Sequence, residues 1–213
     1  MPKKSSRPAL SQARIVTGAL SLVNEKGLDA LSMRGLGSAL GVEPMSLYHW
    51  FKSRDHLLDA MLDAFLGEIK SPACGSWSER LEDVSHQFRA ACHRHPGLVP
   101  YVVVHRFNTK VALGLLEGFL EILTHVKKDA ATRAAAFRLY IHWLIGFCLD
   151  EAAGFSKGPS AQEPPSDEEV LALFPHVVLL GPFNRPDHFD SLFSLGLKAV
   201  LRAILALDES DYC

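Results

Sequence analysis

The residues best suited to contact another molecule lie between Ser32 and Lys52, in the segment SMRGLGSALGVEPMSLYHWFK. The apolar side chains of this segment recur at helical spacing and are expected to face inward: Met33, Leu36, Leu40, Val42, Leu47 and Phe51. On or near the opposite face this leaves Pro44, Met45, Ser46, Tyr48 and His49. A tyrosine and a histidine are unusual on a surface that meets only water, but they can contact DNA phosphates or bases. The pattern therefore indicates binding to nucleic acid.

Two short helices joined by a sharp turn would position these side chains. Ser32 is a candidate N-cap, the first helix would end at Gly41, and Gly41-Val42-Glu43 would form the turn. Pro44 suits the first position of the second helix, where its missing N–H costs nothing. This is the layout of a helix-turn-helix, whose second helix enters the major groove of DNA. Two core helices joined by a turn are the alternative interpretation.

Catalytic chemistry is not indicated by any motif of the chain. Ten histidines could supply a base, and Cys92 or Ser76 could supply a nucleophile. The sequence contains no GxSxG, no HExxH, no glycine-rich phosphate loop and no outstanding pair of carboxylates. We therefore expect a protein that is not an enzyme and that uses no cofactor.

A metal- or redox-responsive regulator is the alternative function. Its best support is the run Cys92-His93-Arg94-His95, with His86 seven residues before His93 on the same helix face. His95 lies past the expected end of that helix, so this is a weak signal for Zn²⁺ or Cu⁺. Exposed histidines at a helix end are the simpler interpretation. The four cysteines, Cys74, Cys92, Cys148 and Cys213, form no CxxC pair and make a poor disulfide framework.

The periodicity of the whole chain predicts an all-α fold. Helices are expected from Ser11 to Gly27, over residues 32–41, 44–51, 54–69, 77–93, 98–105, 109–125 and 129–153, near 166–169 and over 186–207. Tyr101 to Val104 resembles a strand, but this stretch is isolated among helices. Residues 154–166 read as a loop, and a capping-box-like start follows at Ser166.

The order of caps, glycines and aromatic residues resembles the DNA-binding domain of the tetracycline-repressor (TetR) family. The similar residues are Ser32-x-Arg34-x-Leu36, Leu40-Gly41-Val42, Ser46-Leu47-Tyr48 with the aromatic residues that follow, and Lys52. The resemblance covers roughly Ile15 to Ile69 and continues more weakly through Ser76-Trp77, Phe88-Arg89 and Cys148-Leu149-Asp150-Glu151. It implies a DNA-binding domain over residues 1–53. Residues 54–213 would then hold a connecting helix and a helical bundle that binds an effector and forms a homodimer.

The resemblance also implies roles for individual residues at double-stranded, palindromic operator DNA. Arg34 is suited to a bidentate contact with guanine, Pro44 and Met45 to apolar contact with a thymine methyl group, and Tyr48 to a base or phosphate. Side chains that would orient the protein on the DNA backbone are Ser32, Ser46, His49, Trp50, Lys52 and Arg54. The basic arm of Lys3, Lys4 and Arg7 could reach a neighbouring groove or remain solvated. Because Pro44-Met45 replaces polar reading groups, recognition is expected to depend partly on DNA shape.

The second half of the chain has the composition of a ligand-binding and dimerisation domain. Residues 129–153 are apolar nearly all round and the last helix is similar, which predicts a four-helix interface between two subunits; a monomer with a large core is the alternative. The candidate ligand-binding residues are mostly apolar or aromatic: Phe88, His105, Phe107, Asn108, Leu116, Phe119, Phe137, Tyr140, Trp143 and Phe147. They suit a small, flat, largely apolar effector. Effector binding is expected to shift the connecting helix and release the operator.

Charge and hydropathy agree with this division of roles. The net charge of −2 excludes nothing, since the distribution of charge matters more than its sum. The first 14 residues carry four basic and no acidic side chains, whereas residues 71–213 carry 13 basic and 17 acidic ones. The most apolar run, 137–149, is too short to cross a bilayer, which takes about 20 residues. No membrane association and a cytoplasmic location are therefore expected.

Overall fold

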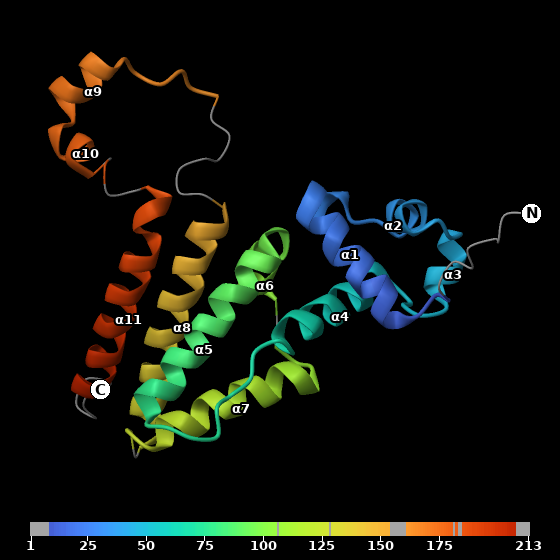
Figure 1. Cartoon of the computed structure of the whole chain (residues 1–213), viewed down its shortest axis with the longest axis horizontal. Coiled ribbons are helices and arrows are strands. Elements are labelled where there is room, and N and C mark those ends of the chain that lie inside the picture. The colour runs from blue at the N-terminus through green and yellow to red at the C-terminus, as the bar shows by residue number, and fades with distance from the viewer. Residues whose placement is uncertain are drawn as a thin grey trace, which may run out of the picture. The chain divides into compact units, whose positions relative to one another are not determined.

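The computed structural model describes residues 9–105, 107–127, 129–153, 161–180, 182 and 185–207, and every regular element within them is a helix. The elements from the N-terminus are α1 (Gln12–Lys26), η1 (Leu28–Ala30), α2 (Met33–Leu40), α3 (Pro44–Tyr48), α4 (Arg54–Leu66), α5 (Trp77–Arg94), η2 (Pro96–Leu98) and α6 (Val99–Val104). They continue with α7 (Lys110–Thr124), α8 (Ala130–Ala153), α9 (Asp167–Leu173), α10 (Pro175–Leu180), η4 (Pro186–His188) and α11 (Phe189–Ala206) (Figure 1). The predicted all-α fold class is confirmed.

The helices form two compact units, which are described separately below. Unit 1 comprises Met1–Lys70 and Ala90–Leu116, and unit 2 comprises Ser71–Arg89 and Glu117–Cys213. The chain therefore passes from one unit to the other at Lys70, within α5 and within α7.

The core of unit 1 is built where α1, α2, α3 and α4 meet. From α1, Ile15, Ala19 and Val23 recur every four residues and are fully buried, because this spacing keeps them on one helix face. The other helices contribute further fully buried side chains: Leu36, Leu47, Leu57, Met61, Leu62 and Phe65. Burial of each large side chain contributes about 1.5–3 kcal/mol relative to exposure. The inward face predicted from the sequence is thereby confirmed, with Leu40 and Val42 half-buried at its edge.

Unit 2 is a bundle in which α8 and α11 run alongside α5 (Figure 1). At its centre the Tyr140 hydroxyl donates to the carbonyl of Leu81 at 3.0 Å and shares a hydrogen bond with Ser85 at 2.6 Å. Burial raises the pKa of this phenol above its ordinary value. The hydroxyl is thus paired inside the core, which removes most of the cost of burying it.

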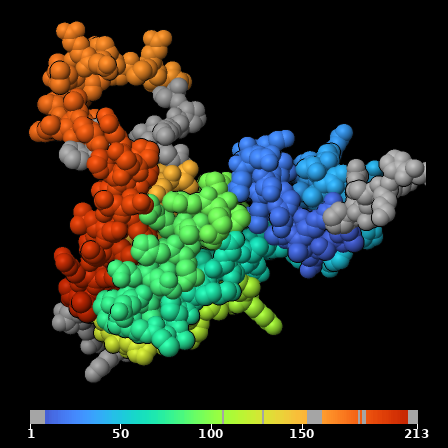
Figure 2. Space-filling view, in the orientation of Figure 1, coloured from blue at the N-terminus to red at the C-terminus, as the bar shows by residue number. Residues whose placement is uncertain are grey.

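An ion pair joins the three helices of the bundle. Arg89 of α5 binds Glu151 of α8 through two hydrogen bonds of 2.8 and 2.5 Å, and it contacts Asp190 of α11 at 2.8 Å. The guanidinium also lies over the Phe193 ring, 4.7 Å from its centroid. Figure 2 shows α11 (red) in direct contact with α5 (green) on this side of the molecule. The side chains of Arg89 and Glu151 are only 12% and 9% exposed, so this ion pair is largely shielded from water.

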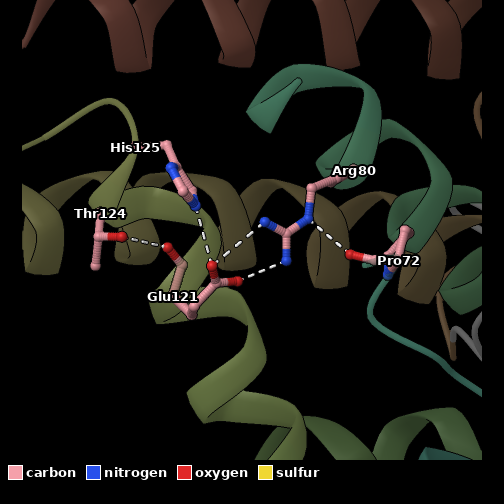
Figure 3. Close-up of polar contacts among 5 residues, drawn as sticks. All are labelled: Pro72, Arg80, Glu121, Thr124 and His125. Atoms are coloured by element: carbon pink, nitrogen blue, oxygen red, sulfur yellow. Dashed lines mark hydrogen bonds and ion pairs between the residues drawn. The ribbon is translucent and has the colours of Figure 1, made fainter. Parts of the chain in front are cut away.

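A second arginine holds the segment that precedes α5. The Arg80 guanidinium donates to the Pro72 carbonyl at 2.7 Å and to both carboxylate oxygens of Glu121 on α7 (Figure 3). His125 contacts the same carboxylate at 3.0 Å. Hydrogen bonds from Arg80 and then His125 hold the pKa of Glu121 below its ordinary value. Glu121 is 48% exposed, so water solvates it as well.

Helices α9 and α10 contact each other and present mostly exposed side chains. Ser166 caps α9 through the capping box predicted from the sequence, in which Glu169 reaches back to the Ser166 backbone N–H. Part of the loop predicted over 154–166 lies outside the described residues. Four other residues named above lie wholly outside them: Lys3, Lys4, Arg7 and Cys213.

Two predicted helix ends differ from the structure. Helix α4 ends at Leu66 rather than near Ile69, because the backbone turns at Gly67 and the Ile69 N–H bonds to Leu66. Helix α3 ends at Tyr48 rather than near Phe51, and the Trp50 N–H bonds to the Leu47 carbonyl three residues before it, as in a turn. The helix predicted over 98–105 corresponds to α6, so the strand-like run 101–104 is helical, with Val102 buried. Among the described residues, no helix has the length and apolarity to cross a membrane.

The two arginines should differ in their effect on stability. Arg89→Ala removes the cation bound to the largely buried Glu151 carboxylate, and breaking such a pair costs about 3–5 kcal/mol of the free energy of unfolding. Arg80→Ala is the matched control and should cost less, because water can solvate the half-exposed Glu121. Urea unfolding followed by circular dichroism, at one protein concentration, measures both. An equal or larger loss for Arg80→Ala would contradict this account.

Candidate DNA interface

The turn between α2 and α3 depends on two glycines. Gly41 has φ 66°, a left-handed conformation that costs other residues energy, and its N–H bonds to the Ser38 carbonyl at 3.2 Å. A Cβ atom on Gly37 would lie 2.9 Å from the Val42 carbonyl oxygen and 3.3 Å from the Pro44 nitrogen. The backbone of the turn can therefore approach α2 only because position 37 lacks a side chain.

Serine caps and one proline set the starts of the helices around this turn. The Ser32 hydroxyl accepts a hydrogen bond from the Gly35 N–H at 3.0 Å, which caps α2. Pro44 stands in the first turn of α3, as predicted. Ser53 caps α4 by accepting from the His56 N–H at 3.1 Å. These caps fix where each helix begins and hence which side chains face outward.

The outward side of α3 and the following turn carries large side chains that the protein does not cover. Met45, Tyr48 and Trp50 are 68%, 43% and 39% exposed, whereas Leu47 and Phe51 of the same segment are buried. The other predicted contact residues divide by exposure. Ser32, Arg34, His49 and Lys52 are exposed, and Pro44 and Ser46 are half-buried.

Arg34 lies beside a hollow formed where α2 meets α3. This pocket, of about 700 Å³, is lined by Arg34, Gly37, Ser38, Gly41, Val42, Glu43 and Pro44. The Arg34 guanidinium makes no hydrogen bond to a residue within the described ranges, so its donors remain available to another molecule.

Arg54 has structural partners of its own. Its Nε donates to the Leu31 carbonyl at 2.8 Å and its Nη2 to the Leu28 carbonyl at 3.1 Å. These bonds tie the start of α4 to η1, the connection between α1 and α2. Its contact with DNA stays a prediction, and no local sequence pattern indicates the carbonyl partners, which lie 23 and 26 residues away.

The ten candidate ligand-binding residues divide between the two units. Unit 2 brings Phe119 close to Phe137 and Tyr140, with ring centroids 6.2 and 5.5 Å apart. It also places Trp143 beside Phe147 at 6.1 Å, and both rings contact Phe193 of α11, which the sequence did not single out. Phe88 is buried on α5 in the same unit. The remaining candidates belong to unit 1: His105, Phe107, Asn108 and Leu116.

The residues of the alternative metal site are engaged elsewhere or lie apart. His95 contacts Glu68 at 2.8 Å, His86 lies against the Phe193 ring, and Cys92 is buried. In the part of the chain that the structure describes, no group of three or more His, Cys, Asp or Glu residues could hold a metal ion.

Polar residues of α4 and the turn after it form contacts that sequence reasoning missed. Asp59 contacts His105 at 2.8 Å, and Asp63 accepts a hydrogen bond from Thr109. Beyond α4, Glu68 bonds to Arg94 and His95. Burial opposes ionisation of Glu68, but these hydrogen bonds outweigh it and lower its pKa. The four-residue spacing of Asp59 and Asp63 was the available signal, yet the same pattern is common on helix faces that meet only water.

Two family models match the chain. The model described as "Bacterial regulatory proteins, tetR family" matches residues 15–61, and "Tetracyclin repressor-like, C-terminal domain" matches residues 71–207. The class D tetracycline repressor of Escherichia coli is 36% identical over 212 residues, covering 91% of this chain and 88% of that protein. The repressor DrrR1 of Streptomyces coeruleorubidus is 30% identical over 134 residues; the match covers 62% of this chain and about half, 48%, of DrrR1.

A solved structure shows the same fold, at a sequence identity close to that of DrrR1. The TetR family protein ActR of Streptomyces coelicolor, in complex with actinorhodin, superposes with a TM-score of 0.72 at 27% identity, covering 92% of this chain and 96% of ActR. Together with the two family models, which account for most of the residues, this likeness agrees with the resemblance visible in the helix-turn-helix. The chain belongs to the tetracycline-repressor (TetR) family of bacterial transcriptional regulators.

Proposed function

We propose that this protein is a dimeric repressor that binds a palindromic operator through α2 and α3 and releases it when a small, largely apolar ligand binds. The observation that carries the DNA-binding part is the exposure of Met45, Tyr48 and Trp50 together on α3 and the turn after it, while Leu47 and Phe51 of the same segment are buried. Exposed apolar groups of this size mark a surface that meets a partner. In this family the partner of that surface is operator DNA.

The contacts proposed for the operator follow from exposure and chemistry. Arg34 reads a guanine through two hydrogen bonds, and Met45 with Pro44 contacts a thymine methyl group. Tyr48 reaches a base or a phosphate. The residues proposed to orient the protein on the DNA backbone are Ser32, Ser46, His49, Trp50, Lys52 and Arg54. Residues 1–53 are proposed as the DNA-binding domain and 54–213 as the regulatory one.

The outward faces of α8 and α11 support the dimer. On α11, Phe193, Leu197 and Ile204 are buried, while Leu195 and Leu205 are 66% and 58% exposed. On α8, Leu139 is also exposed. Apolar residues on both sides of a helix indicate that a second surface is covered. A second copy of the chain would cover it and would place two reading helices at half-sites about 34 Å apart.

The aromatic side chains of unit 2 support a flat, largely apolar ligand. Trp143, Phe147 and Phe193 form one group of rings, and Phe119 with Phe137 and Tyr140 forms another. The Tyr140 hydroxyl is already hydrogen-bonded to Ser85 and to the Leu81 carbonyl, so only the ring of Tyr140 is available to a ligand. The structure of ActR, a structural relative, is a complex with actinorhodin. We extend that compound to this chain as a probe of the proposed ligand class, flat and largely apolar.

Operator selection tests the proposed function. Purified protein is incubated with a random DNA library and the bound fraction is sequenced. A palindrome with two half-sites about one helical turn apart, or slightly more, is the expected result. Enrichment of no sequence at moderate salt would overturn the proposal.

Arg34→Ala should reduce operator affinity selectively. Loss of a bidentate contact costs about 1–3 kcal/mol per half-site and relaxes the preference at one base pair. Lys52→Ala is the comparison variant, because a lost phosphate contact weakens binding to all sequences alike and lowers the salt dependence. Fluorescence anisotropy with the selected operator and single-base variants distinguishes the two. If Arg34→Ala weakened all sequences equally, the guanine contact would be excluded.

Leu195→Glu should convert the dimer to a monomer and abolish tight operator binding, since a charge in an apolar interface is costly to bury. Leu113→Glu, at an exposed leucine of α7, is the control and should remain dimeric. Size-exclusion chromatography with light scattering measures the mass of each. A dimeric Leu195→Glu protein would show that this face of α11 lies outside the interface.

Actinorhodin should weaken operator binding by about tenfold or more, within the usual range of allosteric coupling. Tetracycline with Mg²⁺ is the control and should have no effect, because the family resemblance leads us to expect Val102 and Leu66 at the positions of the histidines of a tetracycline site, and both are buried apolar residues. Anisotropy titrations with and without each compound give the ratio of dissociation constants. Release by tetracycline but not by actinorhodin would reverse the proposed ligand class.

A further inference from the structure

Polar side chains along α4 and just beyond it each bind a different segment of unit 1. Arg54 at the start of the helix donates to the carbonyls of Leu28 and Leu31. Two carboxylates in the middle, Asp59 and Asp63, bind the stretch between α6 and α7. α4 therefore contacts both the connection between α1 and α2 and the stretch from His105 to Thr109.

The two carboxylates hold this stretch at both of its ends. Asp59 Oδ1 lies 2.8 Å from His105 Nε2, and the Tyr101 ring lies against the imidazole with centroids 4.6 Å apart. Thr109 donates its hydroxyl hydrogen to Asp63 while its oxygen accepts from the Ala112 N–H at 3.1 Å, at the start of α7. Asp59 and Asp63 are one helical turn apart, about 6 Å along the axis.

The C-terminal end of α4 is held separately. Glu68 bonds to Arg94 at 2.8 and 2.5 Å and to His95 at 2.8 Å, and the Asn24 side chain of α1 donates to the Arg94 carbonyl at 2.9 Å. The segment just after α4 is therefore tied to Arg94 and His95, while Arg54 ties the start of the helix to η1.

We propose that Asp59 and Asp63 act as a clasp that couples the 105–109 stretch to the DNA-reading helices. The inference rests on the proposed function and deepens it, because Phe107 and Asn108 are candidate ligand contacts between the two held ends and His105 is a candidate contact at one of those ends. A ligand that recruits them either breaks the clasp or moves α4 with it. Asp59 and Asp63 touch neither DNA nor ligand in this scheme and are positioning residues.

Coupling of this kind is reciprocal, so operator DNA can be used as the probe without a known effector. If the clasp links the two sites, operator binding must change the protection of the backbone around residues 105–113. Hydrogen–deuterium exchange measures this change as the difference between free and operator-bound protein, using the duplex selected by the wild type. A purely structural role would alter the free protein and leave that difference intact.

The test compares the wild type with Asp59→Ala/Asp63→Ala and with Glu25→Ala, a control that removes one exposed carboxylate from α1. Operator binding should slow exchange of residues 105–113 about threefold or more in the wild type and in Glu25→Ala, and by less than about half of that in the double variant. Operator affinity should stay within about threefold in all three proteins. Circular dichroism checks that each protein is folded. If the double variant is unfolded, Asp59→Ala and Asp63→Ala are measured separately in its place.

The outcomes separate this inference from the proposed function. Equal slowing in the wild type and the double variant overturns the clasp, and so does operator binding without any slowing in the wild type. In both cases the repressor function stands. A wild-type protein that selects no operator overturns the proposed function and the clasp together.

Discussion

The burial of one face of α4 is the constraint on which the rest of unit 1 depends. Leu57, Met61 and Phe65 are fully buried against α1 and its neighbours, and this packing fixes the rotation of the helix about its axis. Its polar residues are thereby aimed at defined partners: Arg54 at the carbonyls before α2, and Asp59 and Asp63 at His105 and Thr109. The hydrophobic effect supplies the energy, and the hydrogen bonds select which segments the helix joins.

The DNA-reading surface follows from a different local constraint, the close approach of the turn to α2. Gly37 leaves room for the Val42 carbonyl, and Gly41 adopts the left-handed conformation that reverses the chain. With Leu47 and Phe51 held in the core, the large side chains of Met45 and Tyr48 have only the outward side left to occupy. Exposure of these apolar side chains to water is unfavourable, but the packing of Leu47 and Phe51 in the core keeps them on the surface. Such an exposed apolar patch indicates a binding site.

Unit 2 combines an apolar bundle with a few paired charges. Arg89 neutralises Glu151 between α5 and α8, and the hydroxyl of Tyr140 is satisfied by Ser85 and Leu81. These interactions specify how the helices align more than they add to stability, since burying the charges offsets much of their attraction. The exposed leucines of α11, including Leu195, remain on the surface of the single chain and are the part of the bundle that the proposed dimer would cover.

The sequence alone determined the helical fold class, the caps at Ser32 and Ser166, and the inward face of the helix-turn-helix, because these depend on interactions within a few residues. It also carried the family, through the spacing of residues such as Gly41 and Tyr48. Only the tertiary structure decided the partners of Arg54, Asp59 and Arg89, each of which lies at least 23 positions away in the chain. The contacts of a polar residue on a helix depend on which distant segment packs beside it, and no local pattern encodes that choice.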